Sequence, residues 1–193
     1  GNFVVVIDGL GTYGRGRDFH QVAWKNIKDG GFPDRMKWIK SAAKEIPQMD
    51  LNRVGIFGGS AGGQNAMSAL LYHGDFYKAA AADCGCHDNR MDKIWWNEQW
   101  LGWPVDESYE ASSNVVHAAK LDRPLMLTVG ELDTNVDPSS TTQVVDALIK
   151  ADKDFEFYIV PGGGHGAGES DSMRRRRIDF FAKHLGGPEG GRE

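Results

Sequence analysis

Short apolar runs rich in β-branched residues alternate along the chain with segments whose apolar positions repeat at helical spacing. This alternation is typical of βαβ units and predicts an α/β fold with a parallel sheet. Most runs are continuously apolar, which indicates a doubly wound, mainly parallel sheet with helices on both faces. The predicted strands are Phe3–Ile7, Arg53–Phe57, Ala79–Asp83, Pro124–Val129 and Phe155–Val160. The predicted helices are Pro33–Ile46, Ser60–Tyr72, Ser139–Ala151 and Ser172–Leu185.

The stretch Asp88–Val116 interrupts this rhythm, because it is aromatic and irregular. We interpret it as an insertion over the carboxyl edge of the sheet, where open parallel sheets bind ligands. Trp95 or Trp96 is then expected to form one wall of a pocket. Packing of both tryptophans into the core is the alternative, since tryptophan is usually largely buried.

A chain of 193 residues is long enough for one domain and short for two. We assign residues 1–186 to a single, partial catalytic domain and residues 187–193, rich in glycine, to a flexible tail. The chain starts on Gly1 without an initiator methionine and runs directly into the first predicted strand. We therefore expect it to be part of a longer protein.

Charge and composition exclude several classes of function. A net charge of −5 argues against a nucleic-acid surface, which needs a clustered basic face. The basic run Arg174–Arg177 has acidic neighbours and is interpreted as a solvated helix face. No apolar run approaches the ~20 residues that a membrane span needs. Cys84 and Cys86 fit neither zinc nor redox spacing, so no metal or cofactor is implied.

The segment Gly58-Gly59-Ser60-Ala61-Gly62 matches G-x-S-x-G between a predicted strand and a predicted helix. In that context the motif predicts a nucleophile elbow, a sharp turn that presents the serine at the sheet edge. Gly58 and Gly62 are expected where a Cβ would collide as strand and helix cross. The backbone N–H of Ala61 is expected to face the oxyanion of the reaction.

A serine hydroxyl needs a base, and the base needs an acid that orients it. His165 follows the last predicted strand in a glycine-rich loop and is the predicted base. The loop after Pro124–Val129 offers Glu131, Asp133 and Asp137 as the acid. Asp137 precedes a proline and suits a helix N-cap, so Asp133 is preferred. The order Ser, Asp, His is that of α/β-hydrolases.

Four segments together resemble the prolyl oligopeptidase family of serine peptidases, in its dipeptidyl peptidase IV branch. Ile7–Phe19 is similar to the D-G-x-G-T-x-G-R-G loop, and Asp50–Ile56 to the D-x-x-R-[IV]-[AG]-I lead into the elbow. Glu98–Gly102 is similar to E-R-Y-[ML]-G, and Gly130–Val136 to the acid loop H-G-x-x-D-D-N-V. Their order along the chain is more specific than any one of them, and the resemblance covers about Val4–Leu185.

The resemblance implies roles for individual residues. Ser60, Asp133 and His165 match the triad, and Ala61 gives one oxyanion N–H. Asn135 matches an asparagine that contacts substrate near its amino-terminal end. Trp96 falls where a tyrosine lines the proline pocket, and Trp95 is its neighbour. A periplasmic or extracellular location, an upstream β-propeller and self-association are also implied, although the sequence assigns no compartment.

The chain departs from the family pattern in three respects. One is that a second tyrosine of the proline pocket would fall near Asp92, so the pocket is expected to be rebuilt. Ala61 replaces the tyrosine that usually follows the nucleophile, which resembles carboxylesterase elbows. The strands that precede Phe3–Ile7 in the family, with the tyrosine that supplies the second oxyanion donor, are absent from this chain. We expect a truncated α/β-hydrolase in which Phe3–Ile7 pairs with Arg53–Phe57 or the open edge recruits another chain.

The predicted function is peptide-bond hydrolysis by acyl transfer, of the dipeptidyl or prolyl type, on a peptide substrate. A carboxylesterase acting on small acyl esters is the alternative within the same class, favoured by Ala61. A non-catalytic fragment that serves as a scaffold is the alternative outside that class. The isolated chain is expected to be weak or inactive, because one oxyanion donor is worth about 10²–10³ in rate.

Overall fold

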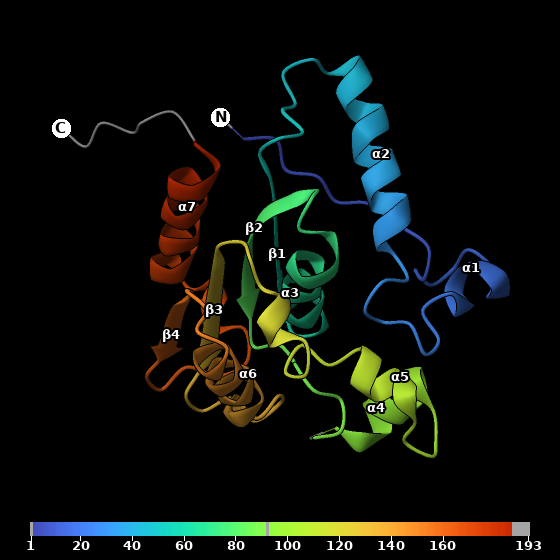
Figure 1. Ribbon diagram of the computed structural model, residues 1–193, viewed down its shortest axis with the longest axis vertical. Helices are drawn as coiled ribbons and strands as arrows, with labels where there is room; N and C mark the ends of the chain where they lie inside the picture. Colours follow the sequence, from blue (N-terminus) through green and yellow to red (C-terminus); the bar gives the residue numbers. More distant parts are fainter. Residues whose placement is uncertain (1, 92, 187–193) are drawn as a thin grey trace.

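Four parallel strands form the sheet in the computed structural model, which describes residues 2–91 and 93–186. The strands are β1 (Val54–Gly59), β2 (Tyr77–Asp83), β3 (Leu125–Gly130) and β4 (Glu156–Val160). They lie side by side in chain order (Figure 1). Parallel order places the loops after all four strands at one edge of the sheet. The tail assigned to residues 187–193 lies outside the described residues, as does Asp92.

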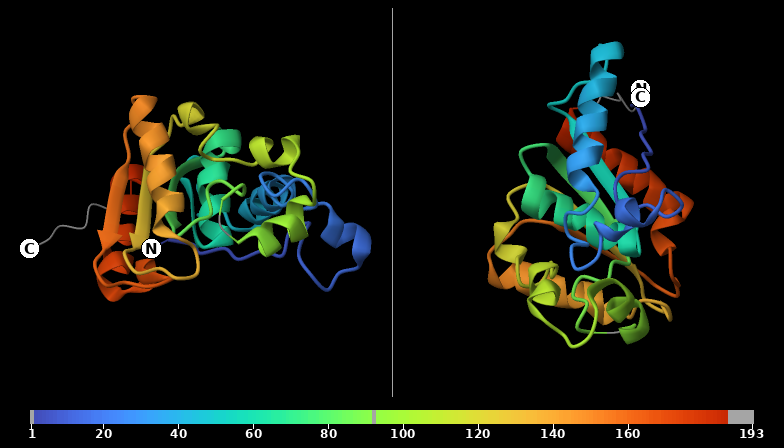
Figure 2. Two further views of the ribbon diagram at one scale, coloured as in Figure 1. Left: turned by 90° about the horizontal axis from the view of Figure 1, so that it is seen from below. Right: turned by 90° about the vertical axis from the view of Figure 1, so that its right-hand side faces the viewer.

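Helices cover both faces of this sheet, so the predicted doubly wound α/β class is confirmed (Figure 2). Helices α3 (Ala61–His73) and α6 (Pro138–Lys150) pack on one face, and α7 (Asp171–Leu185) packs on the other. Strand β2 serves both layers, because Ala80 and Ala82 face α3 and α6 while Ala79 and Ala81 face α7. This period of two is that of an extended strand.

Helix α2 (Phe32–Glu45) extends the first layer beyond α3. Its Phe32 is fully buried, with its ring centroid 5.2 Å from that of His73 and 5.7 Å from that of Tyr77. The short helices α1 (Arg17–Gln21), α4 (Ile94–Leu101) and α5 (Glu107–Ala111) gather at the end of the molecule away from β4 (Figure 1). Single 3-10 turns lie at Ala118–Lys120 and Ala167–Glu169.

The prediction of a strand at Phe3–Ile7 is wrong. These residues have no regular structure and do not pair with β1. Val4 is 73% exposed and Val6 is 92% exposed. A β-branched run favours a strand only where it can pack against neighbours, and this run is largely uncovered. Within the described residues β1 is therefore an outer strand with one open edge.

None of the helices in the described residues has the length and apolarity needed to cross a bilayer.

The aromatic insertion is more regular than the sequence indicates, because it contains α4 and α5. Buried amide and hydroxyl groups attach it to α3, and we call Gln64, Ser68, Asn89, Asn97 and Asn114 the buried polar network. Gln64 Nε2 donates to Asn89 Oδ1 at 2.6 Å, and Asn89 Nδ2 donates to Asn97 Oδ1 at 2.7 Å. Asn114 Nδ2 donates to the Gln64 carbonyl at 3.0 Å. Satisfied buried polar groups of this kind specify one arrangement of the packed elements.

Candidate active site

Ser60 occupies the turn between β1 and α3, with φ 59° and ψ −124°. A non-glycine residue in such a conformation costs of order 1–3 kcal/mol, so the surrounding structure must hold it there. One such contact is the hydrogen bond from Ser60 N to the Asp83 carbonyl, at 2.9 Å. The turn therefore stores backbone strain at Ser60, the serine of the G-x-S-x-G motif.

Two glycines make this tight turn possible. A Cβ on Gly58 would lie 2.5 Å from the Gly62 carbonyl oxygen, as expected for a strand and helix that cross closely. A Cβ on Gly62 would have no atom within 4 Å, so the expected clash at this position is wrong. The second crowded position is Gly63, whose Cβ would lie 2.3 Å from the Asp83 carbonyl oxygen. The reason is that α3 turns Gly63, and not Gly62, toward the end of β2.

His165 and Asp133 meet at the carboxyl edge of the sheet, in the loops after β4 and β3. His165 Nδ1 lies 2.8 Å from Asp133 Oδ2. The Asp133 side chain is fully buried, whereas that of His165 is 27% exposed. The other carboxylate oxygen, Oδ1, accepts hydrogen bonds from the backbone N–H groups of Asn135 (2.8 Å) and Val136 (3.0 Å). The carboxylate is therefore fixed in place by its own loop and directed at the imidazole.

The other two acids of this loop have different partners. Glu131 Oε2 accepts a hydrogen bond from Gly162 N at 2.9 Å, which links the β3 and β4 loops. Asp137 caps α6, since its Oδ1 accepts from Ser139 N at 2.8 Å. Hydrogen bonds from the Ser139 hydroxyl and then from the Ser139 N–H lower the pKa of Asp137. Neither residue has a hydrogen bond to His165 among those that the structure describes.

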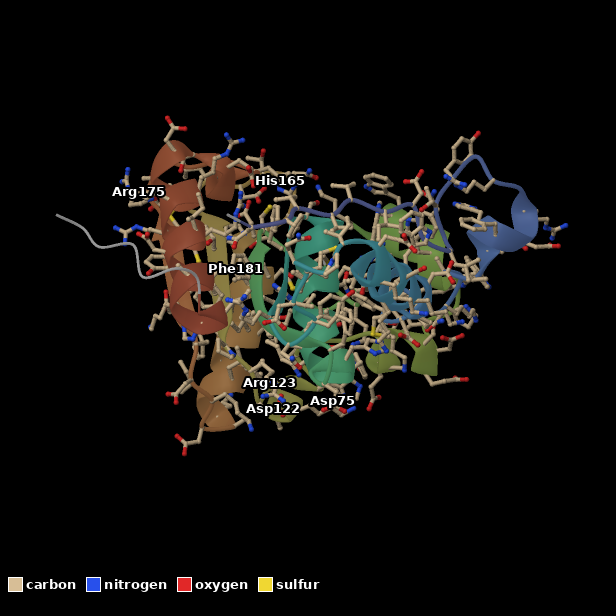
Figure 3. The ribbon with its side chains drawn as sticks, turned by 90° about the horizontal axis from the view of Figure 1, so that it is seen from above. Asp75, Asp122, Arg123, His165, Arg175 and Phe181 are labelled. Carbon is tan, nitrogen blue, oxygen red and sulfur yellow. The ribbon has the colours of Figure 1, made fainter. Side chains whose placement is uncertain are left out.

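His165 lies at the end of the molecule opposite Asp122 and Arg123 (Figure 3). Its Nε2 atom is 4.0 Å from the Cys84 sulfur. No hydrogen bond joins this nitrogen to Ser60 Oγ in the described part of the chain. The same sulfur faces the backbone N–H groups of Gly166 and Ser60. The thiol therefore lies between the serine turn and the histidine.

Asp83 ends β2, and Cys84 follows it directly. Burial raises the pKa of the Cys84 thiol to about 12, with a further contribution from the Asp83 carboxyl. Burial likewise raises the pKa of Asp83, against the opposing effects of the Cys84 thiol and the Gly168 N–H. Gly168 N donates to Asp83 Oδ2 at 3.3 Å, while Oδ1 has no partner among the described residues. The position of Asp83 and Cys84 beside His165 could not be predicted from the sequence, because only tertiary packing brings these side chains together.

Cys84, Asp133 and His165 place one donor atom each within 4.8 Å of one another. Their chemistry does not suit a metal ion. The Asp133 carboxylate already accepts one side-chain and two backbone hydrogen bonds. A thiol with its pKa near 12 is protonated at neutral pH, and only the thiolate binds metals well.

The first turn of α3 supplies backbone donors beside Ser60. The N–H groups of Gly63 and Gln64 donate to the Ser60 carbonyl, at 2.9 Å and 3.1 Å. Those of Ala61 and Gly62 belong to the helix N-terminus, where no intrahelical acceptor is available. An anion placed there also gains from the helix dipole.

A cavity of about 290 Å³ opens next to this turn, and we call it the elbow cavity. Its walls include Ala61 and Gly62 of α3, Trp96 and Trp100 of α4, and Arg35 of α2. The two indole centroids are 6.3 Å apart. A larger cavity of about 500 Å³ lies at the opposite edge and contains no residue that the sequence analysis proposed.

Two expected substrate contacts lie outside the elbow cavity. Trp95 is 67% exposed and does not line it. Asn135 is also exposed, in the loop whose N–H groups hold Asp133. Of the two tryptophans considered for the pocket wall, the structure places Trp96 beside Ala61.

A parallel sheet carrying a strained serine after β1 and a hydrogen-bonded histidine and aspartate after β4 and β3 is the arrangement of α/β-hydrolases. The model of the prolyl oligopeptidase family (Peptidase S9) matches residues 1–188. The chain belongs to this family, as its sequence motifs led us to expect.

Individual relatives agree with this assignment. Dipeptidyl peptidase 8 of Mus musculus is 28% identical over 170 residues, which are 86% of this chain and 19% of the relative. Inactive dipeptidyl peptidase 10 of Mus musculus is 28% identical over 166 residues, which are 84% of this chain and 21% of the relative. The crystal structure of Porphyromonas gingivalis dipeptidyl peptidase 4 matches with a TM-score of 0.82 at 24% identity, covering 92% of this chain and 26% of that one. The chain thus spans about a fifth of the length of these curated relatives.

Proposed function

We propose that this chain carries the catalytic residues of a serine peptidase of the dipeptidyl or prolyl type. Ser60 is the nucleophile, His165 the general base and Asp133 the acid that orients it. The observation that carries the proposal is the hydrogen bond between His165 Nδ1 and the buried Asp133 carboxylate, at the sheet edge where the Ser60 turn ends β1.

The chemistry follows from these positions. Ser60 Oγ attacks the carbonyl carbon of the peptide while its proton passes to His165 Nε2. The resulting oxyanion faces the Ala61 N–H. When the C–N bond breaks, His165 returns the proton to the leaving amine. Water then hydrolyses the acyl ester by the same route. Asp133 accepts the Nδ1–H throughout and stabilises the imidazolium.

His165 Nε2 must come within hydrogen-bonding distance of Ser60 Oγ before this sequence can begin, since no hydrogen bond joins them in the described residues and the Cys84 sulfur lies 4.0 Å from the nitrogen. General-base catalysis needs a distance of about 2.6–3.2 Å, and such contacts often tighten only when substrate binds. The loop suits this movement. Gly162 and Gly166 on either side of the histidine have φ of 67° and 81°, a region that glycine adopts without strain.

Covalent labelling tests the proposal. A fluorophosphonate is expected to add one phosphonyl group at Ser60, as located by peptide mass spectrometry. Ser60→Ala should abolish the adduct, and His165→Gln should slow it strongly. We expect slow labelling, since one oxyanion donor, the Ala61 N–H, is identified and a missing donor costs about 10²–10³ in rate. An adduct on another residue, or one that survives Ser60→Ala, would contradict the assignment.

Carboxylester hydrolysis is the second candidate, because Ala61 leaves space beside the nucleophile that a tyrosine would fill. Matched substrates separate the two activities. A peptidase turns over a dipeptide p-nitroanilide such as Ala-Pro, whereas an esterase turns over p-nitrophenyl acetate and leaves the anilide intact. A relative named as inactive makes the non-catalytic alternative worth testing as well, and absence of any adduct at Ser60 would favour it.

Two further proposals come from the family resemblance and concern partners. One is a β-propeller in the same polypeptide, upstream of this segment. The other is self-association through the open edge of β1, since an exposed strand edge can pair with another chain. The parent reading frame tests the first, and light scattering on the purified chain tests the second.

A further inference from the structure

The elbow cavity contains a cation that has no ion-pair partner among the described residues. Arg35 is half-buried in its wall, and no carboxylate oxygen lies within 4.0 Å of the guanidinium in the described parts of the chain. Its contacts are neutral. Nη1 donates to Asn65 Oδ1 at 2.7 Å, and Cζ lies 5.6 Å from the centre of the Phe32 ring.

The position of Arg35 is electrostatically unfavourable without an anion. The residue lies in the first turn of α2, where the helix dipole disfavours positive charge. Partial burial adds a desolvation cost to the same charge. A guanidinium has five N–H donors, and the one hydrogen bond that Arg35 makes with the described residues uses a single donor. A carboxylate bound beside Arg35 would offset the first two costs by its charge and would accept hydrogen bonds from the remaining donors.

The surrounding backbone is shaped to hold this side chain in place. A Cβ on Gly31 would lie 3.2 Å from both Cζ and Nη2 of Arg35, and one on Gly9 would lie 3.3 Å from its Cγ. Asn65 belongs to α3, the helix that begins directly after Ser60. Its hydrogen bond therefore fixes the guanidinium relative to the nucleophile.

We propose that the elbow cavity receives the side chain of the substrate residue that carries the attacked carbonyl, and that Arg35 selects an acidic side chain there. This inference rests on the proposed peptidase function. Ala61, whose N–H would bind the oxyanion, lines the same cavity, so the adjacent side chain is the one that reaches it. Trp96 and Trp100 give the same cavity apolar walls, and an ion pair is stronger where fewer water molecules surround it.

A carboxylate could reach Arg35 from two sources: the side chain of this residue or the carboxyl terminus of a peptide. Binding to the full chain carrying Ser60→Ala distinguishes them without requiring catalysis. The probes are Ala-Glu amide, Ala-Gln amide and Ala-Gln with a free carboxylate, measured by calorimetry. Only the first has a carboxylate on the side chain alone, and only the last has one at the terminus alone.

We expect Ala-Glu amide to bind about tenfold more tightly than Ala-Gln amide, as a charge-assisted hydrogen bond provides. Arg35→Met should cancel this difference in affinity. Arg35→Lys should retain part of it, because lysine keeps the positive charge but lacks the paired N–H donors of the guanidinium. Arg175→Met is the matched control, since it removes an exposed arginine from α7 (Figure 3), and it should leave the preference unchanged. Circular dichroism checks that each variant folds.

Three results would overturn the inference. The first is that the two amides bind with equal affinity or that neither binds. The second is that Ala-Glu amide binds more tightly and Arg35→Met does not change this preference. The third is that Arg35→Met lowers the affinity only for Ala-Gln with a free carboxylate. A fourth such result is a prolyl amide that binds best to the Ser60→Ala chain both with and without Arg35→Met, which would assign the cavity to an apolar side chain. Fluorophosphonate labelling of Ser60 is independent of these measurements, so the peptidase proposal can stand when this inference fails.

Discussion

The imidazole of His165 lies between two side chains, with Nδ1 2.8 Å from the Asp133 carboxylate and Nε2 4.0 Å from the Cys84 sulfur. The first contact is that of an oriented base. The second brings a neutral thiol close to the nitrogen that has to accept the serine proton during catalysis. Whether Cys84 takes part in the reaction is therefore a question with a definite experimental answer.

We predict that Cys84 is chemically inert in the folded chain. A thiol with its pKa near 12 is ionised to only about one part in 10⁴ at pH 8, and the thiolate is the reactive form. Iodoacetamide should therefore leave Cys84 unmodified in the native chain and modify it after unfolding, as followed by mass spectrometry. Cys84→Ala should label at Ser60 within a few-fold of the wild-type rate. Rapid alkylation of native Cys84 near pH 8 would contradict this prediction.

Substitution of the three acids in the β3 loop should affect the rate of labelling at Ser60 very differently. Asp133→Asn is expected to lower the rate at Ser60 by about 10⁴, because the imidazole loses its orienting carboxylate. Asp137→Asn and Glu131→Gln are matched controls on the same loop, and both should keep the rate within a few-fold. Asp137→Ala should instead lower stability by about 1 kcal/mol through loss of the α6 cap. A large loss of rate from Glu131→Gln alone would move the acid to that residue.

Adjacent glycines in α3 should respond oppositely to a methyl group. Gly63→Ala would force a Cβ to 2.3 Å from the Asp83 carbonyl oxygen, and we expect about 1–3 kcal/mol of destabilisation with slower labelling of Ser60. Gly62→Ala meets no atom within 4 Å and should fold at least as well as wild type. Urea unfolding measures both free energies. Equal destabilisation by the two substitutions would show that the elbow is packed differently.

Stability should fall in mild acid because of one buried histidine. His87 is fully buried, and burial lowers its pKa from 6.5 to about 4. Between these values the unfolded state binds the proton and the folded state does not, so the free energy of unfolding falls as pH falls. The loss attributable to His87 should approach about 3 kcal/mol between pH 7 and pH 4. His87→Gln should remove this part of the pH dependence, and identical slopes for wild type and variant would refute the prediction.

Much of the fold could be predicted from hydrophobic periodicity. Strands β1 to β4 and helices α2, α3, α6 and α7 each lie within two residues of the predicted bounds. Phe3–Ile7 failed because its β-branched residues signal a strand locally, while the structure gives them no packed partner. Helices α4 and α5 were missed because neither the tryptophans of α4 nor the polar residues of α5 have a clear amphipathic spacing. Buried amides stabilise this region instead.

The candidate site likewise contains residues that could be predicted from the sequence and residues that could not. Ser60, Asp133 and His165 could be proposed from the sequence because each follows a recognisable strand and the chain order is informative. Cys84 and Arg35 could not, since nothing in their local sequence marks them. Cys84 matters through a contact with a loop 81 positions away. Arg35 matters because, among the described residues, no carboxylate oxygen lies within 4.0 Å of its guanidinium. Properties of this kind exist only after the chain has folded.

The buried polar network has a consequence for how this pocket could change over generations. It connects α4, which carries the indole wall, to the helix that starts at the nucleophile. A change of loop length in the insertion would leave several buried amides unsatisfied before it altered the cavity. Exchange of Trp96 or Trp100 for other side chains carries no such cost in the network. New substrate preferences are therefore accessible by point substitution on a backbone that stays the same.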